Sequence, residues 1–219
     1  PRQYPLPQWR HPDRRGRRLL LRAGTALRVD IAPLPTTCNL VFDIGTGTGV
    51  LAAILANRGV KNILATDNSA RALACAQENI DRLTLKNYVK VIKADLFPSI
   101  ENGKADLIVC NPPWLPARPS SALESAVYDD KSQMLKGFLS GLKDYLTQTG
   151  EGWLIVSDFA EHLGLRTRDE LMGWISDEGL NLLEKIDIKA KHNKSMDSND
   201  PLHQARKAEV TSLWRLAKA

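Results

Sequence analysis

From residue 39 onward, short apolar runs alternate with longer segments whose apolar residues have helical spacing, and this alternation is the strongest constraint on the fold. The apolar runs predict strands at Asn39–Ile44, Asn62–Thr66, Val89–Ala94, Ala105–Cys110, Gly152–Ser157, Leu182–Ile188 and Glu209–Leu216. Helical patterns lie at Val50–Arg58, after the N-cap candidate Ser69, at Gln133–Leu146 and at Thr167–Asp177. Strands that alternate with helices of this length are typical of βαβ units, so we expect a mainly parallel α/β sheet with helices on both faces.

The last two predicted strands depart from this alternation, because no helical pattern separates them. We expect Leu182–Ile188 and Glu209–Leu216 to pair in an antiparallel manner and to be joined by the polar loop Lys189–Lys207. The predicted fold is therefore a seven-stranded, mostly parallel sheet that ends in an antiparallel hairpin.

The composition indicates one globular domain with an extension. Of the 219 residues, 43% are hydrophobic and 25% are charged, which excludes a wholly disordered chain. No apolar stretch reaches the roughly 18–20 residues that a membrane-spanning helix needs. Residues 1–18 are rich in proline and arginine, so we expect residues 1–38 to be an N-terminal arm or the remnant of an upstream region. Residues 39–219 are expected to form the domain, and the start at Pro1 indicates a cut or processed chain.

Cysteine, histidine and charge give weaker constraints. The cysteines Cys38, Cys75 and Cys110 are too few and too widely spaced for a disulfide framework or a Cys-x-x-Cys zinc site, which favours a reducing cytoplasm. The four histidines lack the spacing of metal ligands, so we expect no metal. The net charge of +5 is mild and only hints at an acidic partner.

A glycine-rich turn, Asp43–Gly49, lies between the first predicted strand and its helix. Glycines here let the backbone turn sharply and let a ligand approach the helix N-terminus closely. The spacing is G-x-G-x-G, with an aspartate two residues before the first glycine, and it differs from the G-x-G-x-x-G fingerprint of dinucleotide-binding proteins. There is also no Gly-Lys-Ser/Thr, which argues against a phosphate-binding P-loop.

Two further aspartates end the next two predicted strands. Asp67 ends the second strand and is placed to accept hydrogen bonds from ribose hydroxyls. Asp95 ends the third strand and is placed to accept from an adenine amine. For any one of these aspartates alone, the cap of a helix or turn is the favoured explanation. Three of them, each at the end of a successive strand, favour a nucleoside-containing ligand.

These residues together resemble the first three motifs of the class I S-adenosylmethionine-dependent methyltransferases, over roughly Asn39–Leu216. The resemblance implies a Rossmann-like fold with S-adenosylmethionine as the cofactor. It also implies a glycine loop under the methionyl part, a second acidic residue at the ribose and a third at the adenine. The residues that match these roles are Asp43, Gly45, Thr46, Gly47, Gly49, Asp67, Asn68, Asp95 and Leu96.

The segment Asn111–Trp114, with the sequence Asn-Pro-Pro-Trp, follows the fourth predicted strand. Its prolines fix φ and lack N–H donors, so the nearby carbonyls form a rigid set of acceptors, and Trp114 offers a flat apolar face. If the Asn111 side-chain oxygen and the Pro112 carbonyl accept both hydrogens of a planar amine, its lone pair turns toward the sulfonium methyl. We expect Asn111, Pro112, Pro113 and Trp114 to be catalytic, with Asn111 also at the cofactor. The structural alternative is a proline-terminated strand followed by a core tryptophan.

The Asn-Pro-Pro-Trp segment resembles the fourth motif of several amino-methylating families. They include adenine methyltransferases of DNA and RNA, small-domain ribosomal RNA guanine methyltransferases and the HemK-type release-factor glutamine methyltransferases. The glutamine enzymes usually have Tyr where this chain has Trp114, and their Pro-Arg-x-x-Thr-Glu-like segment is not found before the first strand. The expected substrate is therefore an RNA base, with glutamine in a ribosomal or translation-factor protein as the alternative.

Two other readings remain open at this point. One is a nucleic-acid-binding protein that keeps the cofactor pocket without turnover, and the other is a nicotinamide oxidoreductase, which the glycine spacing disfavours. Residues 115–130 are either a substrate lid or a simple connection. The basic residues Lys185, Lys189, Lys191, His192 and Lys194 either follow phosphates or form a solvated edge that prevents strand aggregation.

Overall fold

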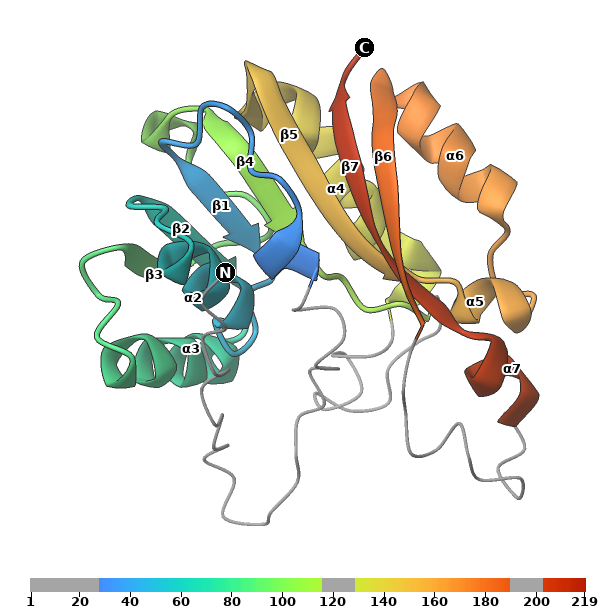
Figure 1. Cartoon of the computed structure of the whole chain (residues 1–219), viewed down its shortest axis with the longest axis horizontal. Coiled ribbons are helices and arrows are strands. Elements are labelled where there is room, and N and C mark those ends of the chain that lie inside the picture. The colour runs from blue at the N-terminus through green and yellow to red at the C-terminus, as the bar shows by residue number, and fades with distance from the viewer. Residues whose placement is uncertain (1–27, 116–128, 190–202) are drawn as a thin grey trace.

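The computed structural model describes residues 28–115, 129–189 and 203–219, which form an α/β unit around one seven-stranded sheet (Figure 1). The strand order is β3-β2-β1-β4-β5-β7-β6. The strands are β1 Val41–Ile44, β2 Ile63–Asp67, β3 Val89–Lys93, β4 Ala105–Cys110, β5 Leu146–Ser157, β6 Leu180–Lys189 and β7 Val210–Lys218. The first five pair in parallel, and β7 runs antiparallel to both β5 and β6. The predicted sheet and its C-terminal antiparallel hairpin are confirmed.

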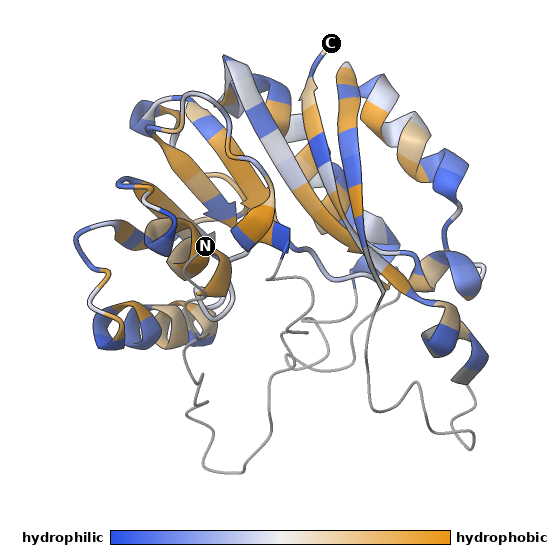
Figure 2. Cartoon of the chain, in the orientation of Figure 1, coloured by the Kyte–Doolittle hydropathy of each residue, from blue (hydrophilic) through white to orange (hydrophobic). Residues whose placement is uncertain are grey.

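Helices cover both faces of the sheet, as predicted. They are α2 Val50–Asn57, α3 Ala70–Arg82, α4 Gln133–Tyr145, α5 Phe159–His162, α6 Arg168–Asp177 and α7 His203–Ala208, with short 3₁₀ turns η1 Ile100–Asn102 and η3 Asp130–Ser132. Neighbouring residues of β1 point to opposite faces: Val41 packs in one apolar cluster with α2 and α3, and Phe42 packs in another with α4 and α6. Figure 2 shows the apolar strands between helices whose outer faces are more polar.

Two helix starts follow from capping residues that the sequence displays. The Ser69 hydroxyl accepts a hydrogen bond from the Ala72 amide at 3.4 Å at the start of α3. At the start of α6, Thr167 and Glu170 form a reciprocal capping box. In both cases a side chain satisfies backbone amides that have no partner within the helix.

The structure corrects one expected strand boundary and adds two helices that were not expected. Strand β5 begins at Leu146 and not at Gly152, because the polar stretch Thr147–Glu151 continues the ladder beside β4 through a register shift. Helix α5 was not predicted, because its four residues are too few for a periodic pattern. Helix α7 begins inside the predicted polar loop Lys189–Lys207 and ends one residue beyond it; its packed apolar residue, Ala205, is too weak a periodic signal. Residues 190–202 of that loop lie outside the described residues.

The described part of the N-terminal segment packs against the body. Val29 and Ala32 are buried in the α2–α3 cluster, and the Arg58 guanidinium donates to their carbonyls at 2.6 and 2.7 Å. Residues 1–27, which hold the Pro/Arg-rich stretch, lie outside the described residues, and the expected boundary after residue 38 stays a prediction. Within the described ranges, no helix combines the length and apolar character needed to cross a bilayer.

Candidate active site at the carboxyl edge of the sheet

The glycine loop adopts a backbone that its glycines make possible. Gly45, Gly47 and Gly49 have φ of 65°, 56° and 80°, in the left-handed region that other residues enter at a cost. The Thr46 amide donates to the Thr66 carbonyl at 2.8 Å, which ties the loop to the end of β2. Gly49 is the N-cap of α2 and provides no side-chain cap. Because α2 begins directly after the loop, the positive end of this helix faces the loop.

Asp43 is fully buried at the base of this loop. Its Oδ2 accepts from the Thr46 hydroxyl at 2.6 Å and from the Ala52 amide at 3.0 Å. Its Oδ1 is buried and has no hydrogen-bond partner among the described residues. Burial raises the pKa of Asp43 to about 6, while the two hydrogen bonds act in the opposite direction. Asp43 therefore shapes the loop at an electrostatic cost.

Asp67 connects the glycine loop to the start of α3. Its Oδ2 accepts from the Gly47 amide at 3.0 Å, and its Oδ1 accepts from the Ser69 amide at 2.9 Å. The capping role considered for this aspartate is thus present. An ionised carboxylate has about four acceptor sites, so these two bonds leave capacity for ribose hydroxyls. Asn68, beside it, is exposed.

Asp95 and Leu96 form the third turn at the same edge. Asp95 is exposed, and Leu96 has a positive φ of 65°. The Thr66 hydroxyl donates to the Leu96 carbonyl at 2.6 Å, so this turn is fixed to the end of β2. The structure therefore brings the three predicted acidic positions to the ends of β1, β2 and β3, which are adjacent in the sheet.

The Asn-Pro-Pro-Trp segment lies beside the glycine loop. Ile44 of β1 pairs with Cys110 of β4, so Gly45 and Asn111 directly follow paired residues on neighbouring strands. Asn111 and Trp114 are partly exposed, and the Trp114 Nε1 donates to the Asn111 Oδ1 at 3.2 Å. The start of this segment therefore lies next to the glycine loop.

Helix α4, which the sequence did not predict to be part of the site, packs against the glycine loop. A Cβ added to Gly45 would lie 2.2 Å from the Met134 Cε, so the methionine packs directly on the loop. Asp129 accepts from the Met134 and Leu135 amides at 2.9 and 3.1 Å and holds the start of this helix. The Asp129 amide donates to the Leu115 carbonyl at 2.7 Å. Residues 116–128 between them, the core of the expected lid, lie outside the described residues.

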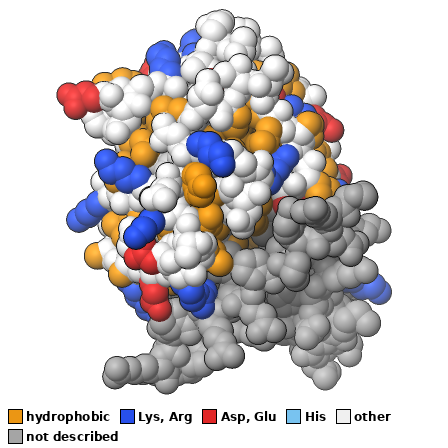
Figure 3. All heavy atoms as spheres, turned by 60° about the vertical axis from the view of Figure 1, so that its left-hand side comes forward, with side chains coloured by type: hydrophobic (Ala, Val, Ile, Leu, Met, Phe, Trp, Pro, Cys, Tyr) orange, Lys and Arg blue, Asp and Glu red, His pale blue; other side chains and the backbone are white. Residues whose placement is uncertain are grey.

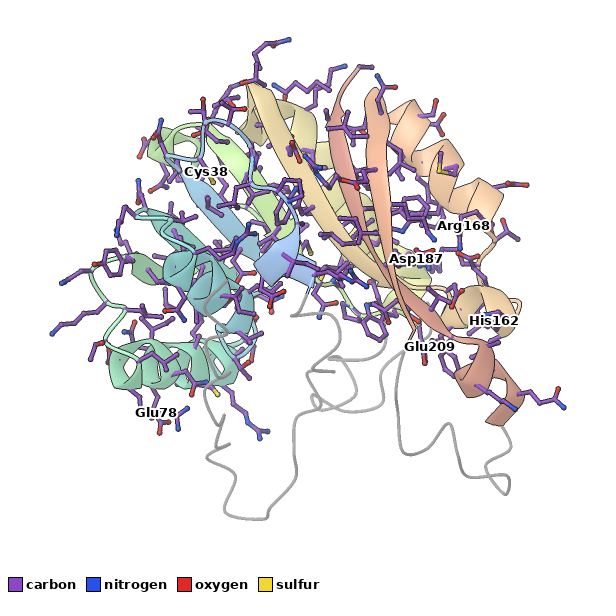
Figure 4. All side chains as sticks on the ribbon, in the orientation of Figure 1. Cys38, Glu78, His162, Arg168, Asp187 and Glu209 are labelled. Carbon is purple, nitrogen blue, oxygen red and sulfur yellow. The ribbon has the colours of Figure 1, made fainter. Side chains whose placement is uncertain are left out.

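A buried polar cluster follows β5, and its members were also missed. The Ser157 hydroxyl donates to the Glu209 carboxylate at 2.6 Å, and both residues are buried. Arg166 is 3% exposed; its Nη2 donates to the Ser157 carbonyl at 3.3 Å, and its Nε has no partner among the described residues. Burial lowers the pKa of Arg166. Figure 4 places Glu209 at this end of the sheet and Cys38 at the opposite end.

The structure describes only part of the basic run near the C-terminal hairpin. Lys185 pairs with Asp187 at 2.5 Å, and Lys191, His192 and Lys194 lie outside the described residues. On the face that Figure 3 shows, the described Lys and Arg side chains are scattered and do not gather into one patch. No group of three or more His, Cys, Asp or Glu that could hold a metal occurs in the described ranges.

Comparison with known proteins places the chain in a family. Residues 21–167 match the methyltransferase small domain, which is more than half of the chain. The chain belongs to the methyltransferase small domain family. This is the class that the glycine loop and its aspartates predicted, and S-adenosylmethionine is the methyl donor expected of that class.

Curated relatives of the chain include both RNA and protein methyltransferases. The chain is 32% identical over 129 residues to a tRNA1(Val) (adenine(37)-N6)-methyltransferase of Bacteroides thetaiotaomicron, which covers 56% of this chain and 54% of the relative. It is 33% identical over 112 residues to a release factor glutamine methyltransferase of Moorella thermoacetica, which covers 51% of this chain and 40% of the relative. The chain thus spans about half the length of these relatives, or less.

Solved structures share the fold. The ribosomal protein L11 methylase of Lactobacillus delbrueckii subsp. bulgaricus matches with a TM-score of 0.59 at 19% identity, over 89% of this chain and 77% of that one. Geranyl diphosphate methyltransferase in complex with S-adenosylmethionine matches with a TM-score of 0.64 at 13% identity, over 89% and 84%. At these identities the likeness shows a Rossmann-like methyltransferase fold and nothing finer.

Proposed function

We propose that this protein transfers a methyl group from S-adenosylmethionine to the nitrogen of a planar amino group. The observation that carries the proposal is the register of β1 and β4, which sets Asn111 beside the glycine loop. A nitrogen acceptor held at Asn111 is then next to a methyl donor held over the loop. Family membership and the fold support the same class of reaction.

The residues at this edge fit S-adenosylmethionine. A Cβ at Gly47 would meet nothing within 4 Å, so the loop is open on that side. The Asp43 Oδ1 is buried without a partner among the described residues, which suits a cationic ligand nearby. The loop would hold the methionyl part, Asp67 the ribose, and Asp95 with Leu96 the adenine. The bound cofactor would supply a methyl group on a sulfonium sulfur, which leaves as a neutral thioether when the methyl is transferred.

The acceptor side positions the nucleophile. The Asn111 Oδ1 and the Pro112 carbonyl accept the two hydrogens of the amine, which turns its lone pair toward the glycine loop. The Trp114 ring stacks on the planar group that carries the amine. The nitrogen becomes acidic only after it gains the methyl, so it loses its proton afterwards and no strong base is required. Orientation of this kind can supply about 7–11 kcal/mol of the barrier in well-ordered systems.

For the substrate we propose an RNA base, adenine or guanine, in the cytoplasm. Trp114 and the tRNA adenine methyltransferase relative support this choice, while the release factor relative supports glutamine. The test is methyl transfer from tritiated S-adenosylmethionine to total tRNA and ribosomal RNA, run beside ribosomal proteins and release factors. Label in RNA alone is expected. Label in protein alone would overturn the RNA assignment, and tight RNA binding without label would favour a non-catalytic binding protein.

A further inference from the structure

The side chains of Asn111 and Trp114 are joined by a hydrogen bond across the two prolines. The Trp114 Nε1 lies 3.2 Å from the Asn111 Oδ1. The indole N–H is a donor only, so the atom that faces it must be the oxygen of the asparagine amide and not its NH2 group. This contact therefore assigns one of the two orientations of the amide, which are otherwise nearly equal in shape.

We infer that Trp114 is a positioning residue that holds the Asn111 amide with its oxygen ready for the acceptor amine, in addition to stacking. The inference rests on the proposed function, because it concerns how that site orients a nitrogen. The prolines at 112 and 113 each fix φ, so the segment between the two side chains has few ways to rearrange.

The bond matters because only one amide orientation is productive. With the oxygen toward the amine, Asn111 accepts one of its hydrogens; with the amide reversed, two N–H groups would face the amine hydrogens and repel them. A neutral hydrogen bond biases such a choice by roughly 2- to 13-fold. Loss of the indole donor therefore lowers the fraction of complexes that can react.

The same bond is compatible with substrate. An amide oxygen has two lone pairs, and the indole occupies one of them. The second remains for one hydrogen of the amine, and the Pro112 carbonyl can accept the other. Stacking alone would not need a donor on the ring, so the two roles of Trp114 are separable by substitution.

Trp114→Phe keeps an aromatic face and removes the donor. We expect kcat for methyl transfer to fall roughly 2- to 13-fold, with KM for the acceptor changed by less than about twofold. Trp174→Phe is the matched control, because Trp174 lies in α6, outside the Asn111–Trp114 segment, and its ring faces Lys136. It should leave both constants unchanged.

An unchanged kcat in Trp114→Phe, or a change in acceptor KM alone, would overturn the positioning role. Should that variant fail to fold, replacement of Trp114 by its benzothiophene analogue decides, since sulfur replaces the N–H in a ring of nearly the same shape. The same kcat loss is expected there, and full activity would overturn the inference. The wild-type assay separates the two proposals: no methyl transfer by the intact protein refutes the proposed function itself.

Discussion

Two parts of the carboxyl edge are held together by different contacts. We call the glycine loop with Asp67 and Asp95 the proposed cofactor half, and Asn111–Trp114 with α4 and the cluster after β5 the proposed acceptor half. Around the glycine loop, hydrogen bonds join residues 3 to 20 positions apart, such as Thr46 to Asp43 and Gly47 to Asp67. Beyond β5, the Ser157–Glu209 bond joins residues 52 positions apart. The glycine loop is thus held by contacts between neighbouring strand–helix units, whereas the cluster after β5 depends on β7, the last strand of the chain, lying beside β5.

Removal of Asn111 should have the largest effect and should be confined to the acceptor half. Asn111→Ala is expected to lower methyl transfer by at least about 100-fold, because misplacement of the reacting nitrogen costs that much. S-adenosylmethionine affinity should fall much less than the rate, although Asn111 is also expected at the cofactor. The measurement is transfer rate beside calorimetric affinity, with the exposed Asn102→Ala in η1 as control. A rate close to wild type would contradict the orienting role.

In the cofactor half, we expect Asp43 to lower the free energy of unfolding by an amount that depends on pH. Its pKa is raised from 3.8 to about 6 in the folded state. A raised pKa means that the protonated form favours folding, so this contribution is full below about pH 4 and is lost as the pH rises through about 6. A shift of this size corresponds to roughly 3 kcal/mol.

Asp43→Asn keeps an acceptor for Thr46 and Ala52 and cannot ionise. The free energy of unfolding of this variant, relative to wild type, should therefore increase as the pH rises from 4.5 to 7.5. Denaturant unfolding at several pH values measures it, with Asp81→Asn, at an exposed aspartate of α3, as the matched control substitution. A difference that is constant with pH would show that the cofactor half carries no such cost.

In the acceptor half, we expect the buried cluster after β5 to stabilise the fold, with a smaller effect than the substitutions above. Ser157→Ala removes the donor to Glu209 and the acceptor for the Phe159 amide, so we expect the free energy of unfolding to fall by about 1–3 kcal/mol. Ser140→Ala, at an exposed serine of α4, should change it by less than about 0.5 kcal/mol. Equal effects of the two variants would remove the distinction between the halves.

The features that the sequence predicted correctly are those that short stretches of residues encode. Glycines with positive φ at Gly45, Gly47 and Gly49 and aspartates at successive strand ends are visible without knowledge of the strand order. Glu209 was missed, because its burial depends on β7 lying beside β5. Arg166 was missed, because its sequence position gives no sign that its side chain lies against the end of β5.

Helix α4 shows how part of the acceptor half could have been anticipated. Gly137 and Gly141 lie four positions apart in this helix, and a Cβ at either would collide with Leu96 or Phe97. Glycines at that spacing in a helix indicate close packing, since glycine otherwise destabilises helices. The sequence therefore held a sign that α4 packs closely against another element, but no sign that this element is the turn after β3 or that Met134 would cover Gly45.

The most direct test of the account is calorimetric titration of the intact protein with S-adenosylmethionine, beside Asp67→Ala. The account predicts binding to the intact protein and an affinity roughly 10- to 100-fold weaker in the variant, because charge-assisted hydrogen bonds are worth about 1.5–3 kcal/mol. Asp81→Ala should bind as the intact protein does. No binding to the intact protein, or equal binding by Asp67→Ala, would contradict the placement of the cofactor at this edge.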